Sequence, residues 1–358
     1  MSSLRMVLGT AAIAAAAFTV AHARERARDS TVGAEPQRDA RTGPDSARVA
    51  SLLAVLGSGD ALVCEMIADQ MGNGWWGSDV NAPGRFSDAR ADMAAAKDSL
   101  HGRITHAGTQ QLLIATLSHE NACVRRAAAK LLGRSRIETA RLIALLDDTS
   151  PRVREAAAFA IGAGEKRSAR VPLETMLARG GAAEAAMAAW ALAEEQDEAS
   201  APALERAMRH DDARVRRASA YALGEIGLLR SVDVLSRALT DREPSVQYAA
   251  AHAIGELHDL ETPPTALLDA CRSSDRTLAR IATLIVADKH DPATLDLLLS
   301  LLNTDDREVR LHVAEALGEI GSVKASDALV RLLKDADPEI RRAAAEALGE
   351  IRENAERP

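Results

Sequence analysis

A unit of about 31 residues recurs along most of this chain. Its clearest copy occupies residues 337–351, and a close match stands upstream, so that Ile340 follows Val309 by 31 residues. Self-similarity at a fixed period of about 20 to 50 residues indicates a solenoid, in which each unit packs mainly against its neighbours. The same register locates the remaining anchors, first the strong copies and then the weak ones: Val246, Val215 and Val153, then Leu278, Glu184 and Val124.

Each unit predicts two helices joined by a turn. In the final copy, residues 326–334 carry one apolar stripe. Asp337 can cap a second helix with Pro338 in its first turn, where a missing N–H costs nothing. Gly349, like Gly318, is expected near the end of that helix, where a short turn begins. The second helix has an apolar face at helical spacing: Ile340, Ala344, Ala347, Leu348 and Ile351.

The composition favours packed helices over a sheet. Hydrophobic residues make up 47% of the chain but aromatic residues only 2%, whereas strands favour aromatic and β-branched residues. The predicted fold class is therefore all-α, a solenoid of about eight helical hairpins over residues 108–352, followed by a tail at 353–358. Acidic and basic residues are mixed within a net charge of -8, and no basic stripe suited to nucleic acid is present.

The first 23 residues resemble a secretory signal peptide. Arg5 precedes an apolar run over residues 7–20, and Ala21, His22 and Ala23 form an A-x-A cleavage site. The run is too short for a comfortable membrane span, although an uncleaved anchor is the alternative. We therefore expect export to the periplasm or the cell exterior, with no stable membrane span after cleavage. Residues 24–45 are polar and predict a flexible tether.

Residues 46–107 predict a degenerate helical cap before the regular array. The pattern is helical over 46–71, turn-rich around Trp75 and Trp76, and helical again over 88–100. Terminal units of solenoids are often atypical because they close an exposed apolar end, and the two tryptophans could fold over the first repeat. The alternative is a loop that stacks on a ligand.

Three cysteines, Cys64, Cys123 and Cys271, show no C-x-x-C spacing. Structural zinc is therefore unsupported, and at most one intrachain disulfide can form. We expect buried free thiols, because free cysteine behaves as a small apolar residue.

The repeat pattern V-R-x-A-A-x-A-L-G-E-I-G resembles the short HEAT repeats of the phycobilin-lyase-like group over about 245 residues. Two copies depart from it: residues 180–195 lack the Val-Arg pair, and residues 276–288 replace the glycine with Ala287. The resemblance implies a right-handed superhelix with first helices on the convex side and second helices lining the concave side.

The catalytic inventory is thin, since no G-x-S-x-G, H-E-x-x-H or P-loop pattern occurs. Deoxyhypusine hydroxylases, which have HEAT-like repeats, bind two irons through repeated His-Glu pairs, but this chain has only His119-Glu120. We therefore predict no metal and no cofactor. A lyase-like enzyme acting on a tetrapyrrole-bearing substrate is the first alternative, and the expected export argues against it.

Charged residues recur beside the anchors. Arginine follows the anchor directly at Arg125, Arg154, Arg216, Arg310 and Arg341. An acidic residue recurs ten positions after it, at Glu194, Glu225, Glu256, Asp288, Glu319 and Glu350. We interpret both rows as charge ladders that fix the stacking of repeats, in preference to a charged ligand groove.

A more specific signal lies six residues after the anchor. This row is expected to face outward along the concave surface, and it reads Lys130, Phe159, Trp190, Tyr221, His252, Leu284, Glu315 and Glu346. Three of the seven aromatic residues outside the signal peptide fall in it consecutively. Interfaces favour Tyr, Trp and Arg. Together with the row one helical turn earlier, it predicts a partner-binding patch of Phe159, Trp190, Tyr221, Tyr248, His252, Arg217 and Arg280.

The alternative for this patch is that the rings fill gaps between repeats. The predicted function is an exported, non-enzymatic scaffold that binds a protein or peptide in the concave groove. A structural spacer of the cell envelope is the second alternative. The partner and the oligomeric state stay open.

Overall fold

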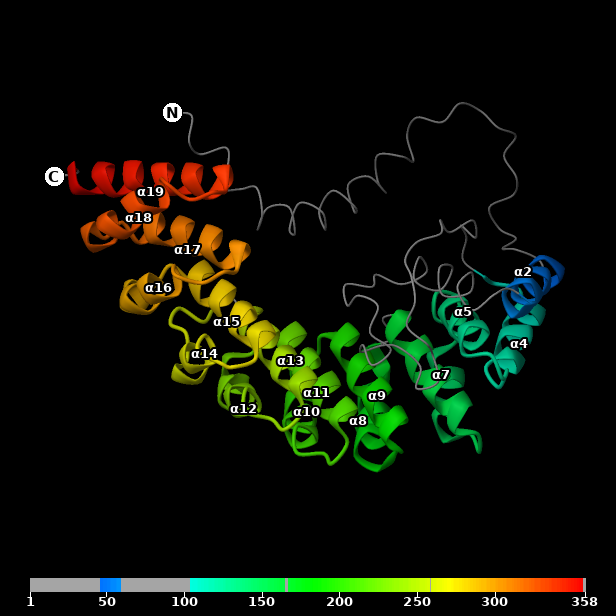
Figure 1. The fold of residues 1–358 in the computed structure, drawn as a ribbon. Coiled ribbons are helices and arrows are strands. Elements are labelled where there is room, and N and C mark those ends of the chain that lie inside the picture. Colours follow the sequence, from blue (N-terminus) through cyan, green and yellow to red (C-terminus); the bar gives the residue numbers. More distant parts are fainter. Residues whose placement is uncertain (1–45, 59–103, 165–166, 258, 357–358) are drawn as a thin grey trace. The chain divides into compact units, whose positions relative to one another are not determined.

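The computed structural model describes residues 46–58, 104–164, 167–257 and 259–356, all within one compact unit, Pro44–Pro358. These residues contain helices and no strands (Figure 1). Helix α2 (Ser46–Ser58) comes first and packs against the first hairpin of the array. The predicted signal peptide, the tether, Trp75, Trp76 and the helix over 88–100 lie outside the described residues.

Eight hairpins follow, each with a first and a second helix. The first helices are α4 (Ala107–Thr116), α6 (Thr139–Ala144), α8 (Arg170–Arg179), α10 (Ala201–Ala207), α12 (Val232–Ala238), α14 (Thr265–Ala270), α16 (Leu295–Leu301) and α18 (Ser326–Leu332). The second helices are α5 (Ala122–Gly133), α7 (Pro151–Ala163), α9 (Ala182–Glu195), α11 (Ala213–Ile226), α13 (Pro244–Gly255), α15 (Arg276–Asp288), α17 (Arg307–Ile320) and α19 (Pro338–Glu356).

Short 3₁₀ turns complete most of the first helices. One extends α6, η2 (Leu145–Asp147). The others precede their first helices: η3 (Arg167–Ala169), η4 (Glu198–Ser200), η5 (Leu229–Ser231), η6 (Pro292–Thr294) and η7 (Val323–Ala325).

The second helices begin and end at the expected kinds of residue. Asp337 accepts a hydrogen bond from the backbone N–H of Glu339 at 2.8 Å, which confirms the predicted cap. Asp212 and Asp306 cap α11 and α17 in the same way. Gly227 and Gly321 end these two helices in the left-handed conformation, with φ of 74° and 69°, which glycine adopts without steric cost.

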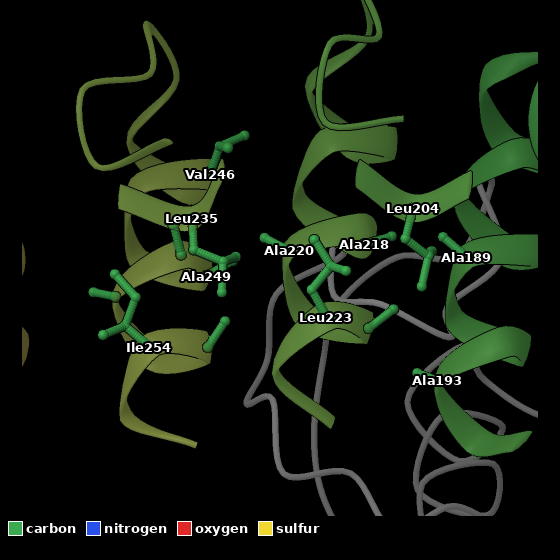
Figure 2. Packing of buried hydrophobic residues seen from close by; sticks show 14 of the residues in the cluster. Ala189, Ala193, Leu204, Ala218, Ala220, Leu223, Leu235, Val246, Ala249 and Ile254 are labelled. Atoms are coloured by element: carbon green, nitrogen blue, oxygen red, sulfur yellow. The ribbon is translucent and has the colours of Figure 1, made fainter. Parts of the chain in front are cut away.

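Each second helix packs against the next one along the chain and against its own first helix. Figure 2 shows this core, in which Leu204 of α10 lies between Ala189 of α9 and Ala218 of α11, and Leu235 of α12 lies beside Ala249 of α13. Small alanines let neighbouring helices approach closely, while leucines fill the space between layers. The fold is therefore an α-solenoid of HEAT-type hairpins, as predicted.

The glycine row lies near the helix ends, as predicted, but it also has a packing role that was not predicted. A Cβ atom on Gly224 would stand 2.8 Å from the Cα of Ala253 on the next second helix, and one on Gly318 would stand 2.7 Å from Ala347 Cα. Gly162 meets Ala191 in the same manner, at 3.0 Å. These glycines serve the close approach of consecutive helices, because each faces the alanine of the next repeat.

Gly349 is the exception in this row. A Cβ atom placed there would meet nothing within 4 Å. Helix α19 does not end near this glycine but runs on to Glu356, through part of the segment that the sequence assigned to a tail.

The cysteines divide into two kinds. Cys271 is a buried free thiol that donates to the Leu267 carbonyl at 3.4 Å, and burial raises its pKa to about 11. Cys123 at the start of α5 is disulfide-bonded. The expectation of free thiols is thus confirmed for Cys271 and wrong for Cys123, while Cys64 lies outside the described residues.

Candidate partner-binding face

The array arginines hold the repeats in register. The Arg216 guanidinium of α11 donates through Nε and Nη2 to both carboxylate oxygens of Asp241, each at 2.7 Å. Its Nη1 donates to the carbonyls of His210 and Asp211, both at 2.8 Å, in the loop before its own helix. One buried side chain therefore ties its own loop to the loop of the next repeat.

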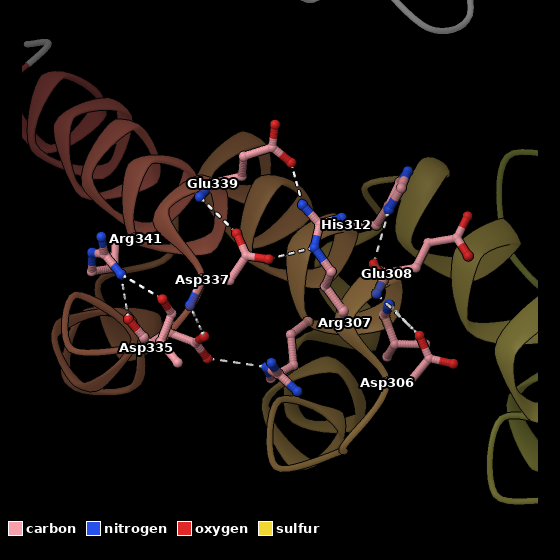
Figure 3. A network of polar contacts seen from close by, with 11 residues as sticks. Asp306, Arg307, Glu308, His312, Asp335, Asp337, Glu339 and Arg341 are labelled. Carbon is pink, nitrogen blue, oxygen red and sulfur yellow. Dashed lines mark hydrogen bonds and ion pairs between the residues drawn. The ribbon is translucent and has the colours of Figure 1, made fainter.

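The same arrangement recurs toward the C-terminus. Arg310 pairs with Asp335 at 3.1 Å and donates to the Thr304 carbonyl. Arg341 donates to the carbonyls of Asp335 and Ala336, as Figure 3 shows beside the pairing of Arg307 with Asp337 and Glu339. The interpretation of this row as a stacking ladder is confirmed for Arg154, Arg216 and Arg310, which each pair with a carboxylate of the next repeat, whereas the bonds described for Arg341 go to its own loop.

The ladder also explains one departure from the repeat pattern. The loop before α9 is short, and Glu184 occupies the position where other repeats have an apolar anchor. Its carboxylate accepts from Arg154 of the preceding repeat at 2.7 Å and from the backbone N–H of Gly181 at 3.2 Å. Glu184 thus replaces the loop aspartate that a longer loop would supply.

The partners described for Arg154, Arg216 and Arg310 lie in the loop or the first turn of the next repeat, outside the acidic row ten residues after the anchor. Burial and the nearby charge of Glu256 raise the pKa of Glu225. For Glu350, burial and then the charges of Glu319, Glu346, Glu353 and Glu315 raise the pKa. Glu225 and Glu350 are therefore influenced by neighbouring carboxylates as like charges, and the prediction that this row belongs to the ladder stays a prediction.

The aromatic rings form the most distinctive feature of the second helices. Phe159 of α7 and Trp190 of α9 are stacked, with centroids 4.9 Å apart and planes 13° from parallel. The Arg126 guanidinium carbon lies 5.6 Å from the centroid of Phe159. Because Phe159 is only 3% exposed, its ring packs against Trp190 and is not accessible to a binding partner.

Tyr221 of α11 comes next and is half-buried. Burial raises the pKa of its hydroxyl, and the charges of Glu225, Glu194 and Glu256 together with the hydrogen bond to Glu225 raise it further. His252 of α13 is also half-buried, and burial lowers its pKa against the opposing effect of Glu256. A tyrosine and a neutral imidazole thus stand beside carboxylates from three consecutive helices.

The remaining predicted residues have local partners. The Tyr248 hydroxyl donates to Asp275 Oδ2 at 2.6 Å, and Asp275 caps α15. Arg280 pairs with Glu308 at 3.2 Å on the exposed surface. Arg217 is buried at 6% exposure, so it cannot offer its guanidinium as a surface contact.

Exposure along the row six residues after the anchor changes with position. Lys130 and Phe159 are buried, Trp190, Tyr221, His252 and Leu284 are half-buried, and Glu315 and Glu346 are exposed. The expectation of an outward-facing row is therefore wrong for Phe159, and the same correction applies to Arg217 in the neighbouring row. A single helical wheel contains no information on the stacking between repeats that covers these two side chains.

We name Trp190, Tyr221, Tyr248 and His252 the aromatic face. The structure brings Phe159 into direct contact with this face and sets Arg280 in a separate ion pair. The sequence reasoning missed Glu194, Glu225 and Glu256 as parts of the same surface. Their signal was present, since each follows a row residue by four positions, one helical turn.

The described residues contain no group of three or more His, Cys, Asp or Glu side chains arranged to hold a metal ion. Among the helices in this part of the chain, none is long and apolar enough to span a membrane.

Comparison with known proteins identifies the family. A model of HEAT repeats matches residues 139–224, 172–255, 207–287 and 264–349 in overlapping windows. The chain is a HEAT-repeat protein. The search of curated proteins finds no match to this HEAT-repeat chain.

Solved structures are similar to this chain at low sequence identity. The Escherichia coli protein YibA is similar at 21% identity and a TM-score of 0.52, covering 67% of this HEAT-repeat chain and 92% of its own. The CpcE–CpcF complex of phycocyanin lyase from Nostoc sp. PCC7120 has 20% identity and a TM-score of 0.38, over 73% and 100%. Human deoxyhypusine hydroxylase has 18% identity and a TM-score of 0.31, over 68% and 96%.

Proposed function

We propose that this HEAT solenoid is a non-enzymatic scaffold that binds a protein or peptide partner on the aromatic face of α9, α11 and α13. The observation that carries the proposal is the series of half-buried rings at one equivalent position in three consecutive helices, Trp190, Tyr221 and His252. Such rings offer large contact areas at a low cost in conformational entropy. In α17 and α19 the same position holds exposed glutamates.

The support for binding over gap filling comes from the difference between Phe159 and its successors. Phe159 is enclosed and already fills the space between α7 and α9, whereas Trp190, Tyr221 and His252 keep part of their surface accessible. The part of these rings that is not enclosed is available for contact with a partner.

We also propose that the protein is exported and loses residues 1–23. The disulfide-bonded state of Cys123 supports an oxidising compartment, because structural disulfides are rare in reducing ones. N-terminal sequencing of the protein recovered from a producing cell tests this proposal, with Arg24 expected as the first residue. A protein that begins at Met1 contradicts it.

The binding proposal is tested by affinity capture from an envelope extract with wild type and the double variant W190A/Y221A. Loss of a defined set of captured proteins by the double variant is expected. Since Trp190 packs on Phe159, the variant also loses stability, so a matched control is needed. Phe159→Leu is that control, because it destabilises the same repeat interface beneath the aromatic face.

Capture by F159L with loss in W190A/Y221A supports binding by the accessible rings. Equal recovery of the same proteins from wild type and W190A/Y221A contradicts the proposal. Recovery of no specific protein by wild type contradicts it as well and favours a structural spacer. Covalent transfer of added bilin to an acceptor protein would favour the lyase-like alternative instead.

A further inference from the structure

We call the contact between two consecutive second helices a joint, and the joints of the described array are not all built alike. Three of them contain an array arginine paired with a carboxylate of the next hairpin: Arg154 with Glu184, Arg216 with Asp241 and Arg310 with Asp335. At three others the helix has no arginine, and the next loop has no carboxylate at the position of Asp241 and Asp335. The residues at these joints are Ala185 with His210, Gln247 with Ser273, and Ala279 with Thr304.

The neutral loop residues keep only one of the two tasks of the aspartates. Asp241 and Asp335 accept the backbone N–H two residues later, both at 2.9 Å, and they also pair with an arginine. The hydroxyls of Ser273 and Thr304 accept the equivalent N–H at 3.1 and 3.2 Å. Gln247 likewise donates to the Asp241 carbonyl in its own loop, as the array arginines do in theirs. These side chains therefore close the loop of their own repeat without the charged pair that joins it to the next repeat.

Helix α15 also differs from its neighbours in bulk. A Cβ atom on Gly224 of α11 would stand 2.8 Å from Ala253 Cα of α13. One on Gly255 of α13 would first meet a side-chain carbon of Ile285 in α15, at 3.3 Å. Ile285 occupies the position that Ala253 has in α13, and α15 itself has Ala287 in place of the glycine. The close glycine–alanine contact is therefore missing on both sides of α15, because the distance between helices depends on the side chains between them.

The joint between α9 and α11 lacks the arginine pair too, but small side chains close it. Ala185, Ala189 and Ala193 of α9 are all fully enclosed, and Figure 2 shows the last two facing α11. In α15 the equivalent of Ala185 is Ala279, which is half-buried, and Ile285 is half-buried as well. The two joints of α15 therefore combine a missing charged pair with looser apolar packing.

The polar contacts that cross the joints of α15 lie nearer the surface. The Tyr248 hydroxyl reaches Asp275 on the side of α13, and the exposed Arg280 pairs with the exposed Glu308 on the side of α17. Exposed ion pairs contribute little to stability, because water and salt screen them. The pair on the side of α17 can therefore break and form again at small cost.

We propose that α15 is a hinge of the solenoid, about which the last two hairpins, α16–α19, change their angle relative to the hairpins that end with α13. Hinge positions in proteins are few and lie where packing imposes the fewest constraints. The two joints of α15 meet this condition, since they lack both the charged pair and the glycine–alanine contact. The hinge does not depend on what the aromatic face binds.

The experiment measures distance distributions between two spin labels in the full chain by pulsed electron spin resonance. The labels are attached to a ketone-bearing amino acid, so the native cysteines are not touched. One pair replaces Arg237 of α12 and Arg331 of α18, three repeats apart with α15 between them. The matched control pair replaces Ala144 of α6 and Arg237, also three repeats apart. All three positions are exposed and equivalent in the repeat.

The distribution for the pair across α15 is expected to be at least about twice as wide as that of the control pair. Equal widths would overturn the proposal. A wider distribution for the control pair would overturn it as well, because that pair spans the joint between α9 and α11.

A variant that supplies the missing pairs tests the cause. Q247R/S273D/A279R/T304D places an arginine and an aspartate at both joints of α15, and aspartate at these loop positions can still accept the backbone N–H, as Asp241 does. We expect the distribution across α15 to narrow to the width of the control pair. S273D/T304D, which adds the aspartates alone, should leave it wide. A folded fourfold variant with an unchanged distribution would contradict the proposed cause, whereas the comparison of label pairs in the wild type needs no variant.

Discussion

The middle helices α9, α11 and α13 and the C-terminal helices α17 and α19 share one packing plan but present different surfaces. In both regions an array arginine joins neighbouring loops, as Arg216 does with Asp241 and Arg310 does with Asp335. In both, a glycine admits the alanine of the next helix. The row six residues after the anchor, however, holds aromatic rings and an imidazole in the middle helices and glutamates in the C-terminal helices.

This difference separates two kinds of position in a repeat. The arginine and glycine positions determine how repeats stack, and most of the repeats that precede another one use them in the same way. The row six residues after the anchor packs between repeats only at some positions, such as the Phe159–Trp190 pair. Elsewhere its side chains can change from repeat to repeat and determine what the surface recognises. The following predictions test the separation, beginning with the stacking positions.

Arg216→Ala should have the largest effect, a loss of about 3 kcal/mol in the free energy of unfolding. The change leaves the half-buried Asp241 carboxylate and two loop carbonyls without the guanidinium that bound them. Arg341→Ala in the last repeat removes the bonds to the Asp335 and Ala336 carbonyls, and about 1 kcal/mol is expected. Urea unfolding followed by circular dichroism measures both values.

The double variant R216A/D241N provides the control for this prediction. Its loss should be smaller than the sum of the two single losses, because the second change removes the unpaired charge. Additive losses would show that the pair does not join the two repeats.

Gly224→Ala and Gly349→Ala should have opposite signs. At Gly224 the new Cβ would meet the Ala253 backbone at 2.8 Å, so α11 and α13 must separate, at a cost of about 2 kcal/mol. At Gly349 nothing stands within 4 Å, and alanine gains about 0.5–1 kcal/mol from its helix propensity. Thermal unfolding should show a lower Tm for G224A and a higher Tm for G349A. A destabilising G349A would contradict the packing role of the row.

The pH dependence of stability should differ between the ladder and the acidic positions. Burial acts to raise the pKa of Asp241, but hydrogen bonds from Arg216 outweigh it and hold the pKa below its usual value. The unfolded chain therefore takes up a proton first, and the stability that Asp241 contributes is lost as pH falls below about 4. For Glu350 the pKa is raised, so the folded chain holds its proton more strongly and ionisation lowers stability as pH rises above about 4.

Two substitutions resolve these opposing effects. D241N should reduce stability at pH 7 and flatten the loss in acid. E350Q should raise stability at pH 7 by a few tenths of a kcal/mol, a small effect because this carboxylate is partly screened by solvent. Unfolding curves between about pH 3 and 7 measure both, and a destabilising E350Q would contradict the repulsion described for that position.

Several structural features followed from the sequence because they depend on local spacing. The repeat register, the cap at Asp337 and the arginine ladder all rest on residues a fixed distance from the anchor. The aspartate partner of Arg216 was missed because it sits in a loop of the next repeat, 25 residues away. Contacts between repeats need the helix-to-helix distance, which periodicity alone does not contain.

The same limit explains the errors at the candidate site. Phe159, Trp190 and Tyr221 are equivalent in sequence, yet only the stacking of α7 on α9 encloses the first of them. The glycine row was correctly predicted near helix ends, but its close contact with the next helix was not predicted, because that contact depends on how repeats stack. The repeat register predicts that the rings lie in one row, but the packing between repeats determines which rings are exposed to solvent.

The bare flank of Gly349 has a consequence for how such arrays change in length. A further helix packed against Gly349 would need a small residue where α19 has Ala347, because Gly318 of α17 packs against Ala347 in the same way. A hairpin of this kind, fused after Glu356, could pack against the Gly349 side of α19 without changes to the repeats before it. The architecture is therefore open to growth by duplication or engineering at this end, independently of the recognition surface in the middle.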